Sequence, residues 1–399
     1  MSRDRGLMLP LTWIADALQE LKTQGLFRRR RVTRVFPDGW CEVDGRRVLD
    51  FASNDYLNLS GDPRVVSAAI EPLRTATAGA RASPLVCGRS PWHEELEQTI
   101  ARFEGQPDAL LFPTGMAANV GTIAALCGPE DLILCDRANH ASLVDGCRLS
   151  QAKFRIYRHD DLVTLERELK KDPGVRRRWI VTDSVFSMDG ETAPLQELCE
   201  IAENSGAELI VDEAHGTGVV GENGRGVCEA FGVEHRVAVR IGTLSKAVGA
   251  QGGFVAGNRD LVEYLWNRAR SQIYSTALSP AVCAAATAAI EIITAEPWRR
   301  TRLAAASKYF REQLRAVGVE TISAATGPIV PVILRDPNAA VDVATRLEQR
   351  GFLVGSIRPP TVPRDTSRLR IVMTTAHRDE DLARLAVAIR EELGHSPTA

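Results

Sequence analysis

The sequence predicts an α/β protein with a largely parallel sheet, and three observations support this prediction. Between about residues 50 and 280, short apolar runs alternate with segments of helical period, which is the pattern of strands and helices in turn. The apolar share is 44% and the charged share 25%, as in ordinary globular domains. Beyond about residue 290 a second, shorter alternation follows. We therefore expect a large domain and then a smaller α/β domain.

The expected strands of the large domain are five short apolar runs, with helices between them. The strands are Ala109–Phe112, Leu132–Leu134, Trp179–Val181, Glu208–Val211 and Gly253–Ala256, and the helices are 93–104, 116–127, 162–171 and 194–205. Ser279 and Pro280 have the N-cap and first-turn chemistry that begins a helix, which ends near Glu296. Ligands of such sheets bind beyond the carboxyl ends of the strands. The residues that follow these runs are therefore the candidates for function.

The C-terminal part is expected to form the smaller domain, completed by the first 50 residues. Its strands are expected at 328–334, Phe352–Ile357 and Leu369–Met373, and its helices at 338–350 and 378–393. Apolar residues between Trp13 and Leu21 recur at helical spacing, which predicts an amphipathic helix packed against the body. The expected division is an N-terminal helix and arm, a large cofactor-binding domain and a small C-terminal domain, at 1–50, 51–290 and 291–399.

Charge and cysteine content argue against several classes of protein. The chain carries 49 basic and 51 acidic side chains, a formal net charge of −2. We expect no nucleic-acid or membrane partner, because such partners are bound through a broad basic field. The eight cysteines include no C-x-x-C pair, so we expect no metal site and a reduced, cytoplasmic protein. The uncharged stretch Ser271–Ile290 is rich in alanine and polar residues and is a poor membrane span.

Four polar segments adjoin the expected strands. They are Pro113–Asn119, Ala138–Ser142, Val211–Gly218 and Gly242–Gly249. In the third segment, Asp212 and His215 come directly after a strand. In the fourth, Lys246 lies among small residues, and a lysine in such a setting has a lowered pKa and a reactive amine. The first segment joins a strand to a helix start, whose N–H groups bind phosphate well.

Together these features are typical of a pyridoxal-phosphate (PLP) site. Such a site needs a lysine that forms an imine with the cofactor, an acidic residue for the pyridine nitrogen, an imidazole over the ring and a helix start for the phosphate. Each feature alone is weak, because most lysines and histidines are exposed and most aspartates at strand ends are caps. Their joint occurrence on alternating strand ends carries the prediction.

Several segments of the sequence resemble the α-oxoamine synthases. They are Asn54–Leu57, Ser187–Gly190, Asp212–Gly218, Thr243–Lys246, Ile273–Thr276, Arg358–Pro363 and Arg368–Arg370. The similarity runs from about residue 10 to 393. It implies the PLP-dependent transferase fold type I, with a mainly parallel seven-stranded sheet in the large domain. It also implies a homodimer with shared active sites.

The resemblance implies a decarboxylative condensation of an amino acid with an acyl thioester. The proline-rich loop Arg358–Pro363, followed by Ser367–Arg370, favours the family member that joins L-alanine to a pimeloyl group. The acyl donor is either a coenzyme A thioester or an acyl carrier protein. Another member, such as the one that joins glycine to an acetyl group, is the alternative.

The resemblance also implies roles for single residues. Lys246 is expected to hold the cofactor and to remove the α-proton, Asp212 to pair with the pyridine nitrogen, and His140 to stack on the ring. His215 and Ser187 are expected to hydrogen-bond the phenolic oxygen. The expected phosphate ligands are the backbone of Gly115 and Met116, the Thr243 hydroxyl, and Ser275 and Thr276 of a second subunit. The expected substrate ligands are Asn54 and Arg370 for the amino-acid carboxylate, Arg358 and Thr361 in a closing loop, and one arginine of the run Arg28–Arg30, such as Arg28, for the distal end of the acyl chain.

Four positions depart from the usual pattern of the family. Asp183, expected near the cofactor, stands where glutamate is common, Asn58 replaces a glycine, and Met116 stands where an aromatic residue sometimes lies. The segment Ala80–Pro84 replaces a glycine-rich run near the acyl substrate. Its Cβ atoms and proline restrict the backbone. A different acyl chain or amino acid is therefore the main alternative.

Two other classes of protein are the alternatives to this prediction. Residues 216–221 match G-x-G-x-x-G, the fingerprint of an NAD-linked oxidoreductase. That fingerprint requires a helix directly after it, whereas loop-forming residues continue to Gly226. A non-catalytic scaffold is the other class, and the presence of the lysine, the aspartate and both histidines argues against it.

Overall fold

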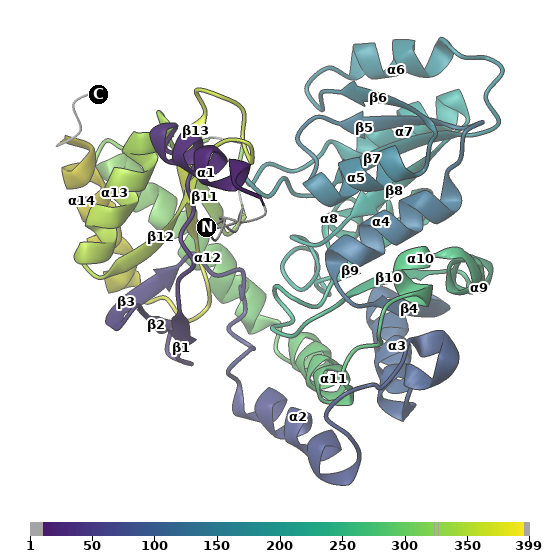
Figure 1. The fold of residues 1–399 in the computed structure, drawn as a ribbon, viewed down its shortest axis with the longest axis horizontal. Helices are drawn as coiled ribbons and strands as arrows, with labels where there is room; N and C mark the ends of the chain where they lie inside the picture. The colour runs from purple at the N-terminus through teal and green to yellow at the C-terminus, as the bar shows by residue number, and fades with distance from the viewer. Residues whose placement is uncertain (1–10, 323, 326, 395–399) are drawn as a thin grey trace, which may run out of the picture.

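Two β-sheets, each in its own lobe, organise the chain (Figure 1). The computed structural model describes residues 11–322, 324–325 and 327–394. The large lobe contains a seven-stranded sheet in the order β4-β10-β9-β8-β7-β5-β6. Its strands are β4 (Asp108–Phe112), β5 (Leu132–Asp136), β6 (Lys153–Tyr157), β7 (Arg178–Asp183), β8 (Ala207–Asp212), β9 (Val239–Thr243) and β10 (Gly253–Gly257). Neighbours from β9 to β6 run parallel, and β10 is antiparallel to both β4 and β9. The predicted mainly parallel sheet is confirmed.

Helices cover both faces of the large sheet and explain why its central strands are apolar throughout. One core cluster joins the sheet to helices that include α4 (Gly115–Leu126), α5 (Ala141–Leu149) and α9 (Arg259–Arg268). A second joins it to α6 (Leu162–Lys170), α7 (Leu195–Ser205) and α8 (Val227–Ala230). The remaining elements of this lobe are α2 (Pro63–Thr75), η1 (Pro84–Gly88), α3 (Pro91–Glu104), η2 (Glu234–Arg236), α10 (Arg270–Ile273) and α11 (Pro280–Ala295).

The small lobe is a six-stranded sheet built from both ends of the chain. Its order is β1-β2-β3-β12-β13-β11. Its elements are β1 (Thr33–Val35), β2 (Trp40–Val43), β3 (Arg46–Phe51), α12 (Trp298–Ala316), β11 (Ile329–Arg335), α13 (Pro337–Gln349), β12 (Phe352–Ile357), β13 (Ser367–Val372) and α14 (Asp379–Gly394). β3 pairs with β12 in parallel, which ties the N-terminal arm to the C-terminal part. The expected domain boundary at 290/291 lies within α11, and the division into domains stays a prediction.

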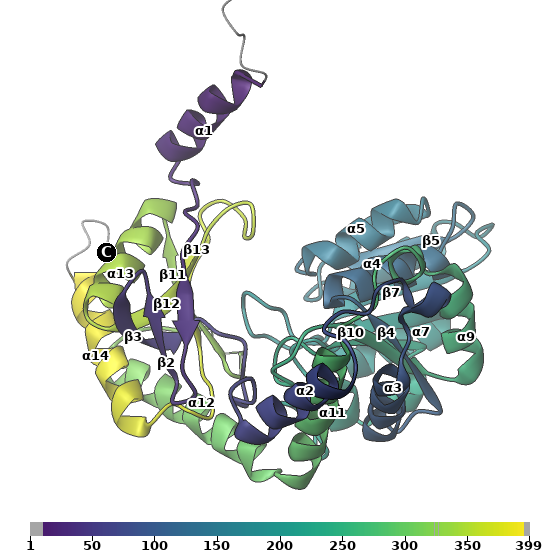
Figure 2. The same cartoon turned by 60° about the horizontal axis from the view of Figure 1, so that its bottom comes forward.

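The N-terminal helix α1 (Trp13–Thr23) forms as predicted, but it does not pack against the body of its own chain. Figure 2 shows it projecting away from the small lobe. None of its residues is buried, and Trp13 is 65% exposed. An amphipathic pattern predicts an apolar face without saying what covers it. That part of the prediction is therefore wrong for the single chain.

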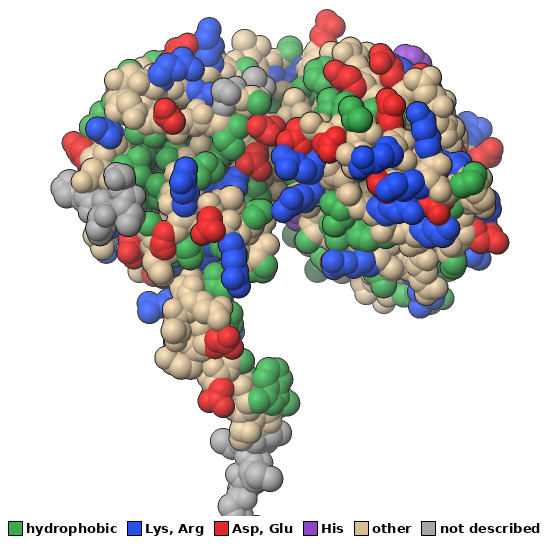
Figure 3. All heavy atoms as spheres, turned by 90° about the horizontal axis from the view of Figure 1, so that it is seen from above, with side chains coloured by type: hydrophobic (Ala, Val, Ile, Leu, Met, Phe, Trp, Pro, Cys, Tyr) green, Lys and Arg blue, Asp and Glu red, His purple; other side chains and the backbone are tan. Residues whose placement is uncertain are grey.

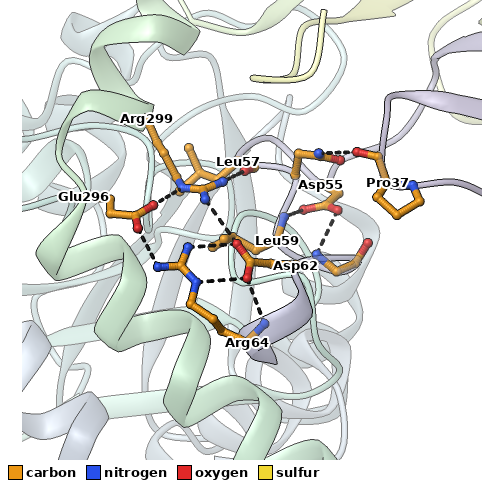
Figure 4. Close-up of polar contacts among 10 residues, drawn as sticks. Pro37, Asp55, Leu57, Leu59, Asp62, Arg64, Glu296 and Arg299 are labelled. Atoms are coloured by element: carbon orange, nitrogen blue, oxygen red, sulfur yellow. Dashed lines mark hydrogen bonds and ion pairs between the residues drawn. The ribbon is translucent and has the colours of Figure 1, made fainter. Parts of the chain in front are cut away.

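A network of charged side chains joins the two lobes at the break between α11 and α12 (Figure 4). Arg299 donates to the Leu57 carbonyl at 2.9 Å and to Glu296 at 2.7 Å, and lies 3.2 Å from Asp62. Arg64 bridges Asp62 at 2.9 Å and Glu296 at 2.5 Å. The Arg64 hydrogen bond lowers the pKa of Asp62 to about 2. The network fixes the segment that runs from Leu57 into α2.

No single helix of the described chain is long and apolar enough to cross a membrane. α11 and α12 satisfy that criterion only as a pair, and they are bent by 78° relative to each other.

Asn58 stands where the family pattern has glycine, and its backbone explains the departure. Its φ is 53°, in the left-handed region that asparagine tolerates better than most residues with a side chain. Its Nδ2 donates to the Pro37 carbonyl at 2.7 Å. Asparagine thus keeps the backbone conformation and adds a contact to the N-terminal arm.

Asn58→Ala is expected to lower the free energy of unfolding by about 1–2 kcal/mol, because alanine pays the cost of the left-handed conformation. Asn58→Gly is the matched control and is expected to stay within about 1 kcal/mol of the wild type, since it loses only an exposed hydrogen bond. Urea unfolding followed by circular dichroism measures both. Equal stability of the two variants would contradict the backbone explanation.

Candidate active site

A cavity of about 230 Å³ lies at the carboxyl ends of strands β7, β8 and β9. It is lined by Thr114, Gly115, Met116, Asn119, His140, Ser142, Asp183, Asp212, Ala214, His215, Thr243, Ser245 and Lys246. This is the sheet edge at which α/β proteins bind their ligands. Larger cavities lie elsewhere, but this one is lined by the last residues of three strands, Asp183, Asp212 and Thr243. The sequence prediction that these segments meet is supported by this geometry.

Lys246 lies in the turn between β9 and β10 and contributes the amine of the cavity. Burial lowers the pKa of this amine to about 8, while the nearby carboxylates of Asp212 and Asp183 oppose the shift. A lysine of ordinary pKa is almost fully protonated near neutral pH. The amine of Lys246 is therefore far more available as a nucleophile than that of a surface lysine.

Asp212 and His140 are linked by the side chain of Asn119. The Nδ2 of Asn119 donates to the Asp212 carboxylate at 2.6 Å and to the Ser142 hydroxyl at 2.8 Å. Ser142 Oγ in turn lies 2.7 Å from His140 Nδ1. The second Asp212 oxygen accepts from the Ala214 amide at 2.7 Å. The acidic group and the imidazole are thus held in a fixed relation by one amide group.

Asp183 supports the loop that carries His140. Its carboxylate accepts from the His140 backbone amide at 2.6 Å, and its own amide donates to Asn139 at 2.8 Å. Burial and the neighbouring Asp212 raise the pKa of Asp183 well above its ordinary value. The shorter Asp183 side chain thus holds the His140 backbone.

A second polar group adjoins the cavity through His215. The Nδ1 of His215 lies 2.6 Å from the Tyr56 hydroxyl. Arg370 donates to Asn54 Oδ1 at 3.0 Å and to the Ser187 carbonyl at 2.7 Å. Three predicted residues, Asn54, Arg370 and Ser187, therefore lie together beside His215, although they do not line the cavity itself.

The start of α4 forms a cradle that fits a phosphate group. Thr114 caps the helix by accepting from the Ala117 amide at 3.0 Å, which leaves the first two amides, of Gly115 and Met116, without an intrahelical partner. A Cβ added at Gly115 would lie only 3.1 Å from the Thr243 hydroxyl oxygen. Glycine at position 115 therefore allows the start of α4 to lie close to the Thr243 hydroxyl. Free backbone amides at a helix start bind phosphate. The donor set fits the phosphate of PLP.

The structure does not bring the other predicted residues to this cavity. Ser275 and Thr276 do not line it, and their expected action on a second subunit stays a prediction. Arg28 and Arg358 line a different cavity, of about 750 Å³, between the N-terminal arm and α13. Arg358 donates to the Phe27 carbonyl there at 2.8 Å, and the exposed Thr361 follows in the same loop. Figure 3 shows further Lys and Arg side chains at the notch between the lobes.

The segment 80–84 lies outside the cavity, against the linker that leads to α11. The Ala82 carbonyl accepts from the Ala277 amide at 3.0 Å. Arg81 keeps a φ of 67°, a left-handed conformation that favours glycine. Residues 216–221 form turns and bends rather than a helix start, which argues against a dinucleotide-binding loop.

Tyr56, Asn119 and Ser142 are among the residues of the site to which the sequence prediction gives no role. Each of the three lies within a segment that the sequence analysis names, so its place in the sequence could have marked it as a candidate site residue. Their hydrogen bonds join residues 159, 93 and 23 positions apart, and such pairings depend on the fold.

The fold and the cavity are those of a PLP-dependent transferase of fold type I. The sequence model for aminotransferase class I and II matches residues 46–389, and the chain belongs to this family. The 8-amino-7-oxononanoate synthase of Alkalilimnicola ehrlichii is 44% identical over 384 residues, which is 96% of this chain and 97% of that protein. The resemblance to the α-oxoamine synthases is confirmed.

Solved structures show the same fold. The serine palmitoyltransferase of S. paucimobilis, solved with a bound PLP–myriocin aldimine, has a TM-score of 0.91 and 30% identity, covering 97% of this chain and 98% of that one. The 8-amino-7-oxononanoate synthase of Francisella tularensis has a TM-score of 0.76 and 29% identity, covering 87% of this chain and 98% of that one. The predicted fold class is therefore confirmed.

Proposed function

We propose that this protein joins L-alanine to a pimeloyl thioester and releases 8-amino-7-oxononanoate, carbon dioxide and the free thiol, as a step of biotin biosynthesis. The carbon–carbon bond forms between the alanine α-carbon and the thioester carbonyl. The thiol is the leaving group, and the alanine carboxylate leaves as carbon dioxide. The observation that carries the proposal is the cavity in which Lys246, Asp212, His140 and His215 converge beside a phosphate cradle.

The proposed substrates are supported by the names of the curated relatives rather than by the superposition on solved structures. The serine palmitoyltransferase superposes better than the Francisella enzyme does. Substrate choice depends on side chains, however, and the curated relatives at 43–46% identity are named 8-amino-7-oxononanoate synthases. Their names therefore carry more weight for the substrates than the TM-scores do.

PLP is the cofactor, and when bound it supplies an electron sink that stabilises a carbanion next to the amino group. Lys246 would hold it, and the amides of Gly115 and Met116 with the Thr243 hydroxyl would bind its phosphate. Asp212 would pair with its ring nitrogen and would favour the protonated form of that nitrogen by opposite charge. Asn119 orients Asp212, so that the charge is fixed before substrate arrives.

The Lys246 amine would be the base that removes the α-proton of alanine. Its pKa of about 8 suits this task, because a general base works best near the operating pH. Asn54 and Arg370, held together at 3.0 Å, supply an amide and a guanidinium for the carboxylate of the amino acid. His140 lies at the exposed mouth of the cavity, where its ring can cover the reacting face.

The protein is proposed to act as a cytoplasmic homodimer that shares its sites. The support for a dimer is the position of Ser275 outside its own cavity, beside Tyr274, which is 71% exposed. The support for a reducing compartment is that all eight cysteines are free. Coenzyme A and an acyl carrier protein both remain as proposed carriers of the acyl group.

A substrate panel tests the proposed reaction. Alanine, glycine, serine and threonine are each combined with acetyl, pimeloyl and palmitoyl thioesters, and carbon dioxide release is measured. Alanine with the pimeloyl thioester is expected to exceed every other pair. Highest activity with glycine and the acetyl thioester, or with serine and the palmitoyl thioester, would overturn the proposed substrates.

The attachment of PLP to Lys246 is expected to become faster as pH rises and to level off above about pH 8. Only the neutral amine attacks an aldehyde, so below its pKa the rate should fall about tenfold for each pH unit. Stopped-flow absorbance on protein freed of cofactor measures this rate. Lys246→Arg is the control and should show no attachment. A midpoint near 10.5, the ordinary lysine value, would contradict the role of burial.

A further inference from the structure

Tyr56 is a buried residue of the Asn54–Leu57 segment to which the proposed reaction assigns no role. Its side chain has no exposed surface, and its hydroxyl lies 2.6 Å from His215 Nδ1. A buried hydroxyl at this distance from a ring nitrogen forms a strong hydrogen bond. Since His215 lines the cavity, the contact couples Tyr56 to the active site without placing Tyr56 in it.

The distances to the surrounding acceptors indicate the direction of this hydrogen bond. The Tyr56 hydroxyl has two acceptors within reach, His215 Nδ1 and Asn54 Oδ1. A hydroxyl has one proton to donate, and the shorter contact, to His215, is the stronger hydrogen bond. Asn54 Oδ1, at 3.4 Å, is the more distant acceptor and already receives a hydrogen bond from Arg370. The Tyr56 proton therefore points to His215 Nδ1.

The charge states of both partners agree with this assignment. Burial raises the pKa of Tyr56 to about 12, so that the phenol keeps its proton. Burial, together with the positive charges of Lys246 and Arg370, lowers the pKa of His215 well below its ordinary value, so that the imidazole is neutral. A neutral imidazole carries one proton, and when Nδ1 accepts a hydrogen bond that proton is on Nε2.

We propose that Tyr56 is a positioning residue that holds His215 in the Nε2-protonated tautomer, so that the ring offers a hydrogen-bond donor to the cavity. The inference rests on the proposed function in one respect, since the acceptor it serves is the phenolic oxygen of PLP. Without the Tyr56 hydroxyl, the ring is free to place its proton on Nδ1. Nε2 would then present a lone pair to an oxygen that also carries lone pairs.

The tautomer is measured directly by ¹⁵N nuclear magnetic resonance of histidine-labelled holoenzyme. The chain has seven histidines, and His215→Gln identifies the resonances of His215 by their loss. We expect Nδ1 of the wild type to show the shift of an unprotonated nitrogen and Nε2 that of a protonated one. In Tyr56→Phe, both nitrogens should move toward averaged values. A wild-type Nδ1 that carries the proton would overturn the proposal.

A double-mutant cycle then tests whether Tyr56 acts through His215. Tyr56→Phe is expected to raise the dissociation constant of PLP about 3- to 10-fold, the effect of losing one net hydrogen bond. In a His215→Gln background the same change should have less than about a twofold effect, because the tautomer no longer exists. An undiminished effect in that background would show that Tyr56 acts through Asn54 or Arg370 and would overturn the proposal.

Tyr157→Phe is the matched control, since it removes a hydroxyl from another buried tyrosine that does not line the cavity. It should leave the His215 resonances and the PLP affinity unchanged. A change as large as that in Tyr56→Phe would point to a general packing effect. The resonances report the tautomer whether or not alanine and a pimeloyl thioester are the substrates. Failure of this inference is therefore distinguishable from failure of the proposed reaction.

Discussion

Lys246→Ala is expected to abolish the condensation, with turnover lowered by about 10⁴-fold, the upper end of what positioned proton transfer contributes. The same amine anchors the cofactor and moves the α-proton, and no other lysine lines the cavity in the described part of the chain. The variant should also lose the visible absorbance of lysine-bound PLP. Carbon dioxide release and absorbance spectra measure the two effects.

Lys308→Ala is the control for this prediction. Its side chain is 80% exposed, and its amine lies 4.0 Å from Glu312 on the surface of α12, an arrangement worth little to stability. This variant should keep both the spectrum and the turnover of the wild type. A Lys246→Ala enzyme with normal turnover would refute the assignment of the site.

Asp212→Asn is expected to keep most of its PLP affinity and to lose about 10²–10³-fold in turnover, the range seen when one charge-stabilising group is removed from a water-excluded site. A neutral side chain no longer favours the protonated pyridine nitrogen. The new amide also faces the Asn119 Nδ2, which donates to Asp212 at 2.6 Å in the wild type. Two donors would then oppose each other. Steady-state kinetics and PLP titration measure the outcome.

Asn119→Ala separates the charge of Asp212 from the network that orients it. This variant keeps the carboxylate but removes its link to Ser142 and His140. Its turnover should fall by about tenfold, much less than in Asp212→Asn, because one hydrogen bond is lost while the charge remains. Equal losses in the two variants would show that orientation, and not charge, explains the effect of Asp212.

The strands predicted from the sequence are those with continuous apolar runs, and the strands it missed contain charges. β9 includes Arg240, whose guanidinium is buried and lies 3.1 Å from Glu104 and 2.9 Å from Glu234. β6 begins with Lys153 and includes Arg155, which pair with Asp172 at the edge of the sheet. Both strands form ion pairs with residues outside the strand itself. Hydrophobic periodicity does not detect such pairs.

Helix α12, which was not predicted, has a similar explanation. α12 carries many arginines, and its buried face includes Leu303, Phe310 and Leu314. The few apolar residues of this face give a weak helical pattern in the sequence. α1 was predicted from its apolar spacing, but that spacing does not define its packing partner. The sequence therefore predicts the elements that have a strong apolar pattern. It does not predict which distant segments those elements pack against.

In the active site too, some features follow from the sequence and others depend on the fold. Asp212, His215 and Lys246 follow strand ends in the sequence and line one cavity in the structure, because the carboxyl ends of parallel strands meet at one edge of a sheet. The arginines at positions 28–30 could not be assigned in this way. Arg28 lines a cavity beside α13 rather than the one that contains Lys246, and its predicted contact with the acyl chain stays a prediction.

The most direct test of the central claim is to find the lysine that holds the cofactor. Holoenzyme is reduced with borohydride, which fixes PLP irreversibly to that lysine, and its peptides are analysed by mass spectrometry. The account predicts the phosphopyridoxyl mass on the peptide that contains Lys246 and on no other. Labelling of a different lysine, or of none in protein that binds PLP, would contradict it.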